Sequence, residues 1–207
     1  MRAAKRAADV VVSAILLLML VPAMAAIVLA IATVMGSPVL FKQRRLGLQG
    51  RQFTMLKFRT MRTDTDSEGR LLPDALRLTR LGAFLRSTSL DELPQLLNVL
   101  KGEMSLVGPR PLMPEYMPYY TQREQLRHTV RPGITGWAQV RGRNQARWDE
   151  RLAMDVWYVE NWSLWLDARV LALTLMAVLG RKGVVVDPAS AMPSLDEERK
   201  QWLTRST

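Results

Sequence analysis

The chain has 207 residues, with 29 Lys and Arg against 19 Asp and Glu, a formal net charge of +10 and no cysteine. This length fits one ordinary domain with its own core, and the absence of cysteine excludes disulfide scaffolds and Cys-ligated zinc. Hydrophobic residues make up 48% of the chain, which excludes general disorder. The basic excess predicts an anionic partner: nucleic acid, a lipid headgroup surface or a phosphorylated substrate.

The first long feature is a stretch without Asp, Glu, Lys or Arg from Val10 to Phe41, of which Val10–Met35 is almost wholly apolar. A straight helix over Val10–Val34 would be about 37 Å long, enough to cross a hydrocarbon core of roughly 30 Å. Pro22 lies in the middle of the run, where proline removes a backbone donor and favours a bend. Basic residues flank both ends: Arg2, Lys5 and Arg6 before the run, and Lys42, Arg44, Arg45 and Arg51 after it.

Because basic residues prefer the cytoplasmic side, we expect a re-entrant helix-hairpin, bent at Pro22, that returns both flanks to that side. Two alternatives stay open. A true span would force one flank across the membrane, and a cleaved signal peptide is suggested by the small-residue run Ala23–Ala26. Against the signal peptide, the apolar run continues to Val34, and an arginine-rich, cysteine-free domain is not typical of secretion.

After the membrane run, short extended segments at Pro38–Gln43 and Gln52–Phe58, joined by a glycine-bearing turn at Leu46–Gly50, predict a β-hairpin. Polar residues from Thr63 to Arg70 predict a loop. Helical patterns follow at Asp74–Leu85, Leu90–Leu100, Met113–Thr129, Arg147–Glu160 and Leu164–Leu179. The predicted fold is α+β and α-rich, with a re-entrant membrane helix, a small sheet and several amphipathic or interfacial helices.

The last of these helical patterns, Leu164–Leu179, is mostly apolar and follows Trp157, Trp162 and Trp165. Tryptophan gathers where membrane meets water, so this segment is either an interfacial helix or an ordinary core helix. The tail after Lys182 is polar enough to be partly disordered.

Candidates for chemistry are densest between Arg86 and Pro111. Asp91 lies on a polar strip of the predicted helix, opposite its leucines. A structural interpretation competes with a catalytic one, because Ser89 to Glu92 has the pattern of a capping box and acidic residues in a first turn are favoured by the helix dipole.

Cations around this segment favour a catalytic role of Asp91 over a capping role. Lys57 and Arg59 end a predicted strand, Arg86 precedes the acidic pair, and Arg110 lies in a rigid Pro-Arg-Pro frame. Such groups suit phosphate, although they could also contact anionic lipid headgroups. A carboxylate among them is expected to have a lowered pKa and to act as a nucleophile toward phosphorus or a ligand for a hard cation.

Other sequence patterns give weaker evidence for a functional site. His128 is the sole histidine, so a multi-histidine metal site is excluded, and no Walker A or GxGxxG motif is present. The glycine-rich stretch from Arg131 to Asn144 is either a phosphate cradle or a plain connecting loop.

Five motifs together are specific: FKQRRLG at 41–47, KFRTM at 57–61, RSTSLDELPQLLNVLKGEMSLVGPRP at 86–111, RPGITGWAQVRGRN at 131–144 and DVWYVENWSLWLD at 155–167. With them the chain resembles the small monotopic phosphoglycosyl transferases of the bacterial sugar transferase family, from the membrane segment to about Gly183. The family commonly has Ser-Pro at the membrane bend, whereas this chain has Val21-Pro22, and valine cannot satisfy a freed backbone group.

The resemblance implies transfer of a sugar 1-phosphate from a UDP-sugar to undecaprenyl phosphate, with release of UMP, at the start of bacterial glycoconjugate assembly. It makes Asp91 the nucleophile that forms a phosphosugar-aspartyl intermediate and the residue associated with Mg²⁺, with Glu92 assisting. The implied phosphate-binding or nucleotide-binding residues are Lys57, Arg59, Arg86, Arg110 and Arg143.

The resemblance also implies three regions and a location. Residues 1–36 would form the re-entrant membrane helix, 37–183 a catalytic domain on the cytoplasmic face of the inner membrane, and 184–207 a polar tail. The expected partners are the UDP-sugar, undecaprenyl phosphate and membrane lipids, with no nucleic acid; no oligomeric state is predicted. Gly142 to Trp148 resembles the branch that starts protein N-glycans, which favours an N-acetylated amino sugar such as diacetylated bacillosamine.

Two rival functions compete with this expectation. A basic membrane-anchored module that binds nucleic acid or lipid without catalysis would show steeply salt-dependent DNA binding. A classical glycosyltransferase would move the sugar without its phosphate and release UDP instead of UMP.

Overall fold

The structure is a computed structural model that describes residues 3–142, 147–180 and 194–205. It begins with the long helix α1 (Ala3–Met35), followed by an antiparallel hairpin of β1 (Leu40–Leu46) and β2 (Gln52–Phe58). The other elements are α2 (Asp74–Arg77), α3 (Arg80–Ser87), α4 (Gln95–Lys101), β3 (Ser105–Val107), β4 (Gly133–Thr135), α5 (Trp137–Arg141), α6 (Trp148–Glu160), α7 (Leu164–Leu179) and α8 (Leu195–Arg205). The fold is helix-rich α+β with small sheets, as predicted.

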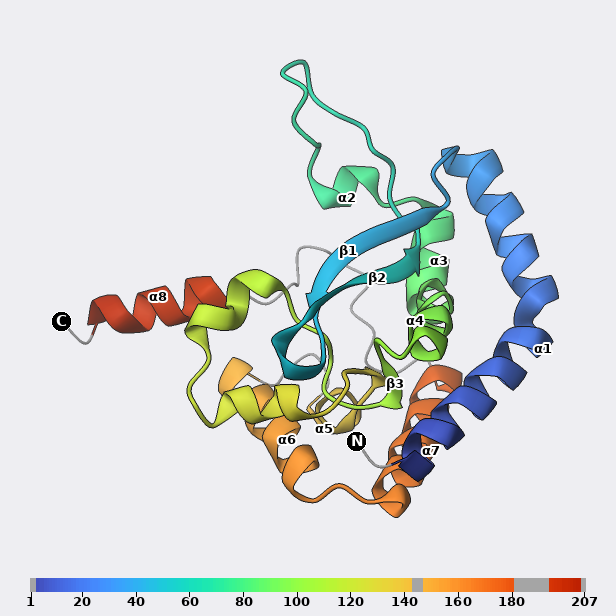
Figure 1. The fold of residues 1–207 in the computed structure, drawn as a ribbon. Helices are drawn as coiled ribbons and strands as arrows, with labels where there is room; N and C mark the ends of the chain where they lie inside the picture. The colour runs from blue at the N-terminus through green and yellow to red at the C-terminus, as the bar shows by residue number, and fades with distance from the viewer. Residues whose placement is uncertain (1–2, 143–146, 181–193, 206–207) are drawn as a thin grey trace.

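Helix α1 is continuous through Pro22 and is long and apolar enough to cross a membrane, with a mean hydropathy of 2.9 over its most apolar window. It runs along one side of the molecule, beside α3 and α4, and changes direction about halfway (Figure 1). Leu18 is 77% exposed and Met19 is 71% exposed. This middle part of α1 therefore offers an apolar surface that the described chain leaves uncovered.

Both halves of α1 pack on the rest of the chain. Leu16 and Leu20 contact a buried cluster that contains Val170 of α7. Further along, Ile31 is fully buried with Phe58 of the hairpin. The two ends of the helix are therefore held by one and the same body.

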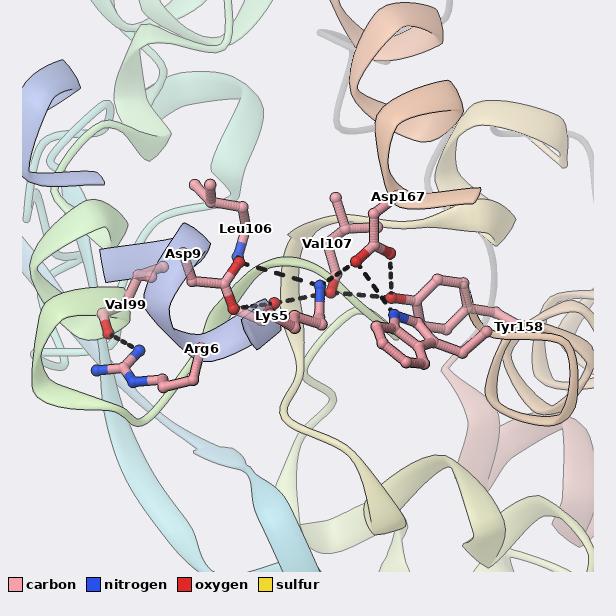
Figure 2. Close-up of polar contacts among 10 residues, drawn as sticks. Lys5, Arg6, Asp9, Val99, Leu106, Val107, Tyr158 and Asp167 are labelled. Atoms are coloured by element: carbon pink, nitrogen blue, oxygen red, sulfur yellow. Dashed lines mark hydrogen bonds and ion pairs between the residues drawn. The ribbon is translucent and has the colours of Figure 1, made fainter. Parts of the chain in front are cut away.

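The start of α1 is held by a buried polar network (Figure 2). Lys5 Nζ lies 2.5 Å from Asp167 Oδ2, and the other Asp167 oxygen accepts a hydrogen bond of 2.6 Å from the Tyr158 hydroxyl. Asp9 accepts hydrogen bonds from the Ser105 hydroxyl at 2.8 Å and from the Leu106 amide at 3.2 Å. Because buried charges are costly unless paired, this network holds the start of α1 against β3 and α7.

Arginines bind the carbonyls at two helix ends nearby. Arg6 donates to the carbonyls of Val99 and Leu100 at the end of α4, at 2.6 and 3.0 Å. Arg59 donates to the carbonyls of Met35 and Gly36, where α1 ends. The last carbonyls of a helix lack the full set of intrahelical partners, and the two arginines supply donors to these ends.

The hairpin is confirmed, with pairs running from Leu40 opposite Phe58 to Leu46 opposite Gln52. A 3-10 turn at Leu48–Gly50 joins the strands. The first strand begins at Leu40, later than the predicted Pro38. A second, parallel pair of β3 and β4 was not predicted from the sequence.

Two predicted helices are interrupted. In place of a helix over Asp74–Leu85 the structure has α2 and α3, and the Thr79 side chain caps α3 by accepting from the Gly82 amide at 2.9 Å. In place of one over Leu90–Leu100 it has a 3-10 turn at Leu90–Glu92 and then α4, which starts after Pro94.

The predicted capping box at Ser89 is wrong. Ser89 adopts the left-handed conformation, with φ of 57°, and its side chain makes no capping hydrogen bond. The residue instead reverses the chain between α3 and the 3-10 turn Leu90–Glu92. A non-glycine residue in this conformation is uncommon, and such strained residues cluster at functional sites.

The predicted helix at Met113–Thr129 is also wrong. It is replaced by 3-10 segments at Pro114–Tyr119 and Glu124–Thr129, because Pro118 cannot continue a regular helix. By contrast, α6 and α7 lie where they were predicted.

The polar tail contains a helix that the sequence interpretation missed. Leu195 of α8 is fully buried against a core cluster that includes Trp148. Arg199 of the same helix pairs with Glu124 at 2.7 Å and with Asp149 at 2.6 Å. The helix α8 is thus part of the folded body.

One prediction follows from the close approach of α3 to the chain after β2. A Cβ on Gly82 would lie 1.8 Å from the Thr60 carbonyl oxygen. Gly→Ala inside a helix normally stabilises by about 1 kcal/mol, but Gly82→Ala is expected to destabilise by roughly 1–3 kcal/mol through overpacking. Thermal unfolding in detergent measures this, with Ala83→Gly as a control that costs only helix propensity. A raised unfolding temperature for Gly82→Ala would contradict the packing.

Candidate active site

The acidic pair lies in the 3-10 turn that follows Ser89, facing β2 and the Pro-Arg-Pro segment. Lys57 Nζ on β2 is 2.6 Å from Glu92 Oε1 and 3.8 Å from Asp91 Oδ2. Arg110 donates to the same Glu92 oxygen at 3.0 Å. The structure therefore brings four of the predicted site residues into one ionic cluster.

The other predicted residues lie at different distances from this cluster. Arg86 lines the same cavity and donates through Nε to the Thr60 hydroxyl at 3.1 Å. Arg59 also lines the cavity, but its guanidinium binds the carbonyls at the end of α1 and is not part of the ionic cluster. Arg143 lies outside the described residues.

The two carboxylates have opposite electrostatic surroundings. Burial raises the pKa of Asp91 above its ordinary value, although Lys57 and Arg110 oppose the shift. For Glu92, burial would raise the pKa, but the charges and hydrogen bonds of Arg110 and Lys57 outweigh it and lower the pKa to about 2. The expected lowering therefore holds for Glu92 and is wrong for Asp91.

Asp91 is the less constrained of the two carboxylates. Its residue is 8% exposed, and within the described part of the chain its carboxylate accepts no hydrogen bond. Glu92 is committed to its two cations. A desolvated carboxylate with a perturbed pKa in a cavity, next to fixed positive charge, is typical of a functional group.

The cavity around the pair has a volume of about 1030 Å³. Its polar wall carries Asp91, Glu92 and the cations described above, while apolar residues from α1 and α7, among them Leu16, Leu20 and Leu171, also line it. A ligand in this cavity can therefore contact fixed charges and membrane-helix side chains together.

A buried ion pair behind the site was missed by sequence reasoning. Arg127 binds Asp155 at 2.8 Å and also donates to the Arg110 carbonyl at 2.6 Å. It thereby fixes the backbone that carries Arg110. Both residues are buried in the folded core. Their pairing depends on the tertiary fold, so the sequence offered no signal that Arg127 supports the Arg110 backbone.

The glycine-rich stretch after Arg131 supports the same segment. A Cβ on Gly133 would lie 2.1 Å from the Gly108 nitrogen, so the two backbones pass in direct contact. This contact places β4 beside β3, next to Pro109 and Arg110. In the described residues 131–142 the stretch acts as a packing element of the site.

A magnesium site can be tested against the donors that are present. The described ranges contain no group of three or more acidic or histidine side chains that could hold a metal. Magnesium, however, is often bound through one or two carboxylates, with water and substrate phosphates supplying the other ligands. Asp91, whose oxygens are without hydrogen bonds, fits this mode, whereas Glu92 is occupied by Lys57 and Arg110.

The model of one protein family, described as bacterial sugar transferase, matches residues 1–181. This chain belongs to the bacterial sugar transferase family. It is 58% identical over 149 residues to a Bacillus subtilis protein named uncharacterized sugar transferase EpsL, covering 72% of this chain and 74% of that protein.

Two further relatives have names that state an activity, UDP-glucose:undecaprenyl-phosphate glucose-1-phosphate transferase. The one from Xanthomonas campestris is 45% identical over 191 residues, which cover 86% of this chain and 39% of the relative. The one from Caulobacter vibrioides is 42% identical over 190 residues, which cover 84% of this chain and 69% of the relative. The chain thus spans well under half of the Xanthomonas protein.

The contrast between the carboxylates predicts opposite effects on stability. Because the folded state raises the pKa of Asp91, its charge is unfavourable at pH 7, and Asp91→Asn is expected to raise the unfolding temperature. Glu92 has its pKa lowered from an ordinary 4.5 to about 2, so it stabilises the fold above pH 4.5 and loses this contribution as the pH falls toward 2. Glu92→Gln should therefore cost about 3 kcal/mol at pH 7 and flatten the acid limb of stability.

Thermal unfolding of both variants from pH 3 to pH 7 checks this. Equal losses in the two variants at pH 7 would contradict the different environments of the carboxylates.

Proposed function

We propose that this protein transfers a sugar 1-phosphate from a UDP-sugar to undecaprenyl phosphate at the cytoplasmic face of a bacterial inner membrane, releasing UMP. The observation that carries the proposal is a buried carboxylate without hydrogen bonds, Asp91, beside a Glu92–Lys57–Arg110 cluster in a cavity that reaches the apolar helix α1. Membership of the bacterial sugar transferase family and the names of its relatives support it.

The reaction we propose has two balanced steps. An Asp91 oxygen attacks the β-phosphorus of the donor, the bond from that phosphorus to the bridging oxygen breaks, and UMP leaves with the electron pair. An oxygen of undecaprenyl phosphate then attacks the same phosphorus and displaces Asp91. The products are UMP and undecaprenyl diphosphate sugar, and the carboxylate is regenerated.

The cations stabilise the charge on the phosphates during these steps. Lys57 and Arg110, held by Glu92, lie close enough to Asp91 to bind the phosphate under attack. Glu92 stays ionised and positions both cations. Asp91 would hold Mg²⁺, which would supply positive charge against the diphosphate of the donor.

The proposal also concerns which sugar the UDP donor carries. The names of the Xanthomonas and Caulobacter relatives favour UDP-glucose. The N-acetylated amino sugar expected from the sequence is carried as the competing donor. Parallel assays with UDP-glucose and with UDP-diacetylbacillosamine decide between them.

The contacts of α1 support a re-entrant placement in the membrane. A straight helix of its length would measure about 50 Å, so the ends of a spanning helix would lie on opposite sides of a bilayer. Here Lys5 at one end and Ile31 near the other are both buried in the same domain. The exposed middle part, around Leu18, would then enter one leaflet.

Side chains of α7 support a position of this helix at the membrane–water interface, beside α1. Trp165 is 75% exposed, and Leu175 and Met176 are each 60% exposed. Exposed tryptophan and apolar side chains on a helix next to a membrane element suit the boundary between lipid and water.

Single-cysteine variants test the placement, since the natural chain has no cysteine. Ala4→Cys before the apolar run and Ser67→Cys in an exposed loop are both expected to react with a membrane-impermeant maleimide only from the cytoplasmic side. Leu18→Cys should react from neither side. Labelling of Ala4→Cys from the periplasm, with Ser67→Cys labelled from the cytoplasm, would show a spanning helix instead.

Asp91→Asn tests the proposed nucleophile. Turnover, measured as UMP release, is expected to fall by about 10³-fold or more because no covalent intermediate can form. Mass spectrometry of quenched protein should show a phosphosugar adduct on Asp91 in the wild type and none in the variant. Asp64→Asn, in an exposed loop, is the control and should retain full activity. Release of UDP in place of UMP, or an active Asp91→Asn enzyme, would overturn the mechanism.

A further inference from the structure

Arg45 is among the cavity cations that take no part in the Glu92–Lys57–Arg110 cluster. Arg45, near the end of β1, is half-buried and lines the same cavity as Asp91 and Arg110. Its guanidinium donates to Gln43 Oε1 at 2.6 Å and to the Pro111 carbonyl at 3.3 Å. Its Nε is buried without a hydrogen-bond partner.

Within the described ranges Arg45 forms no direct ion pair, although the more distant Glu115 offsets part of its charge. In the part of the chain that the structure describes, no carboxylate lies within 4.0 Å of its guanidinium. Burial and the nearby positive charge of Arg110 lower the pKa of Arg45 to about 10. Two neighbouring guanidinium groups, one of them without a carboxylate of the described chain within ion-pair distance, favour an anion between them.

We propose that Arg45 binds the α-phosphate of the UDP-sugar, the phosphate that leaves as UMP. This inference rests on the proposed function and adds a donor-binding residue to it. Arginine suits the role because its planar group offers several donors to phosphate oxygens.

The position of Arg45 favours a soluble nucleotide over a lipid-borne phosphate. Strand β1 starts at Leu40, which packs in the cluster that contains Ile31 of α1. It ends at Leu46, whose cluster contains Trp148 and, among the described residues, no side chain of α1. Arg45 is about 17 Å along the strand from Leu40, and Figure 1 shows the strand leading away from the end of α1.

The order of the charges favours the α-phosphate over the β-phosphate. Arg110 and Lys57 contact Glu92, next to the carboxylate that would attack the β-phosphorus. Arg45 makes no contact with the acidic pair, and instead holds the Pro111 carbonyl beyond Arg110. A donor with its β-phosphate at Asp91 can therefore place its second phosphate between Arg110 and Arg45.

The test compares Arg45→Gln with Arg44→Gln in the full-length protein. Arg44 is the neighbouring cation on the same strand, exposed and directed to the opposite face. In a two-step transfer, kcat/KM for the donor reports the first half-reaction and kcat/KM for undecaprenyl phosphate reports the second. Binding of UMP by calorimetry gives a readout that needs no turnover.

Arg45→Gln is expected to lower donor kcat/KM and UMP affinity by about tenfold or more, with acceptor kcat/KM within about twofold of wild type. Arg44→Gln should change none of these, and Arg45→Lys should restore part of the donor effect by its point charge. If Arg45→Gln does not fold, the same comparison between Arg45→Lys and wild type decides, with a donor-only loss expected.

Three results would overturn the inference: unchanged UMP affinity, a loss confined to the acceptor, or equal losses for both substrates with a lowered unfolding temperature. The last would mean that Arg45 only supports the Pro111 backbone. If the wild-type protein neither binds UMP nor releases it from a UDP-sugar, the proposed function itself fails and this inference fails with it. A wild type that does both, with Arg45→Gln unaffected, refutes the inference alone.

Discussion

The site depends on one interaction, the pairing of Glu92 with both Lys57 and Arg110. This pairing joins β2, the 3-10 turn and the Pro-Arg-Pro segment, which no local sequence preference would bring together. The two cations also stabilise the ionised form of Glu92 and lower its pKa to about 2, despite burial. Within the described residues, Asp91 is thereby left with only a long ion pair to Lys57, which suits the nucleophilic role proposed for it.

A second constraint joins this site to the membrane helix. Lys5 and Asp9 would be costly inside a bilayer, and here each is buried against protein through Asp167 and Ser105 (Figure 2). The cavity that holds Asp91 reaches side chains of the same helix. A rigid link between helix and domain keeps a lipid-borne acceptor and a soluble donor in one frame, which the proposed transfer requires.

The sequence predicted the features that local chemistry determines. Turn residues predicted the β-hairpin, and helical periodicity predicted α6 and α7. The charge pattern predicted that Asp91 lies among cations. The sequence interpretation failed at Ser89, which is left-handed in place of a helix cap, and over Met113–Thr129, where the helical pattern was followed although Pro118 interrupts a regular helix. The buried Arg127–Asp155 pair could not be foreseen either, because its partners are 28 residues apart and only the folded core pairs them.

The charges left unbalanced in this structure share one explanation. Asp91 is desolvated without a hydrogen bond, and Arg45, which faces the same cavity as Arg110, has no carboxylate within ion-pair distance among the described residues. Each feature costs folding free energy in the absence of ligand. A diphosphate with a divalent cation would bring charges of both signs to these positions, positive toward Asp91 and negative toward the arginines. Charged groups that the fold fixes in place need little reorganisation during reaction, which is the arrangement that the proposed transfer requires.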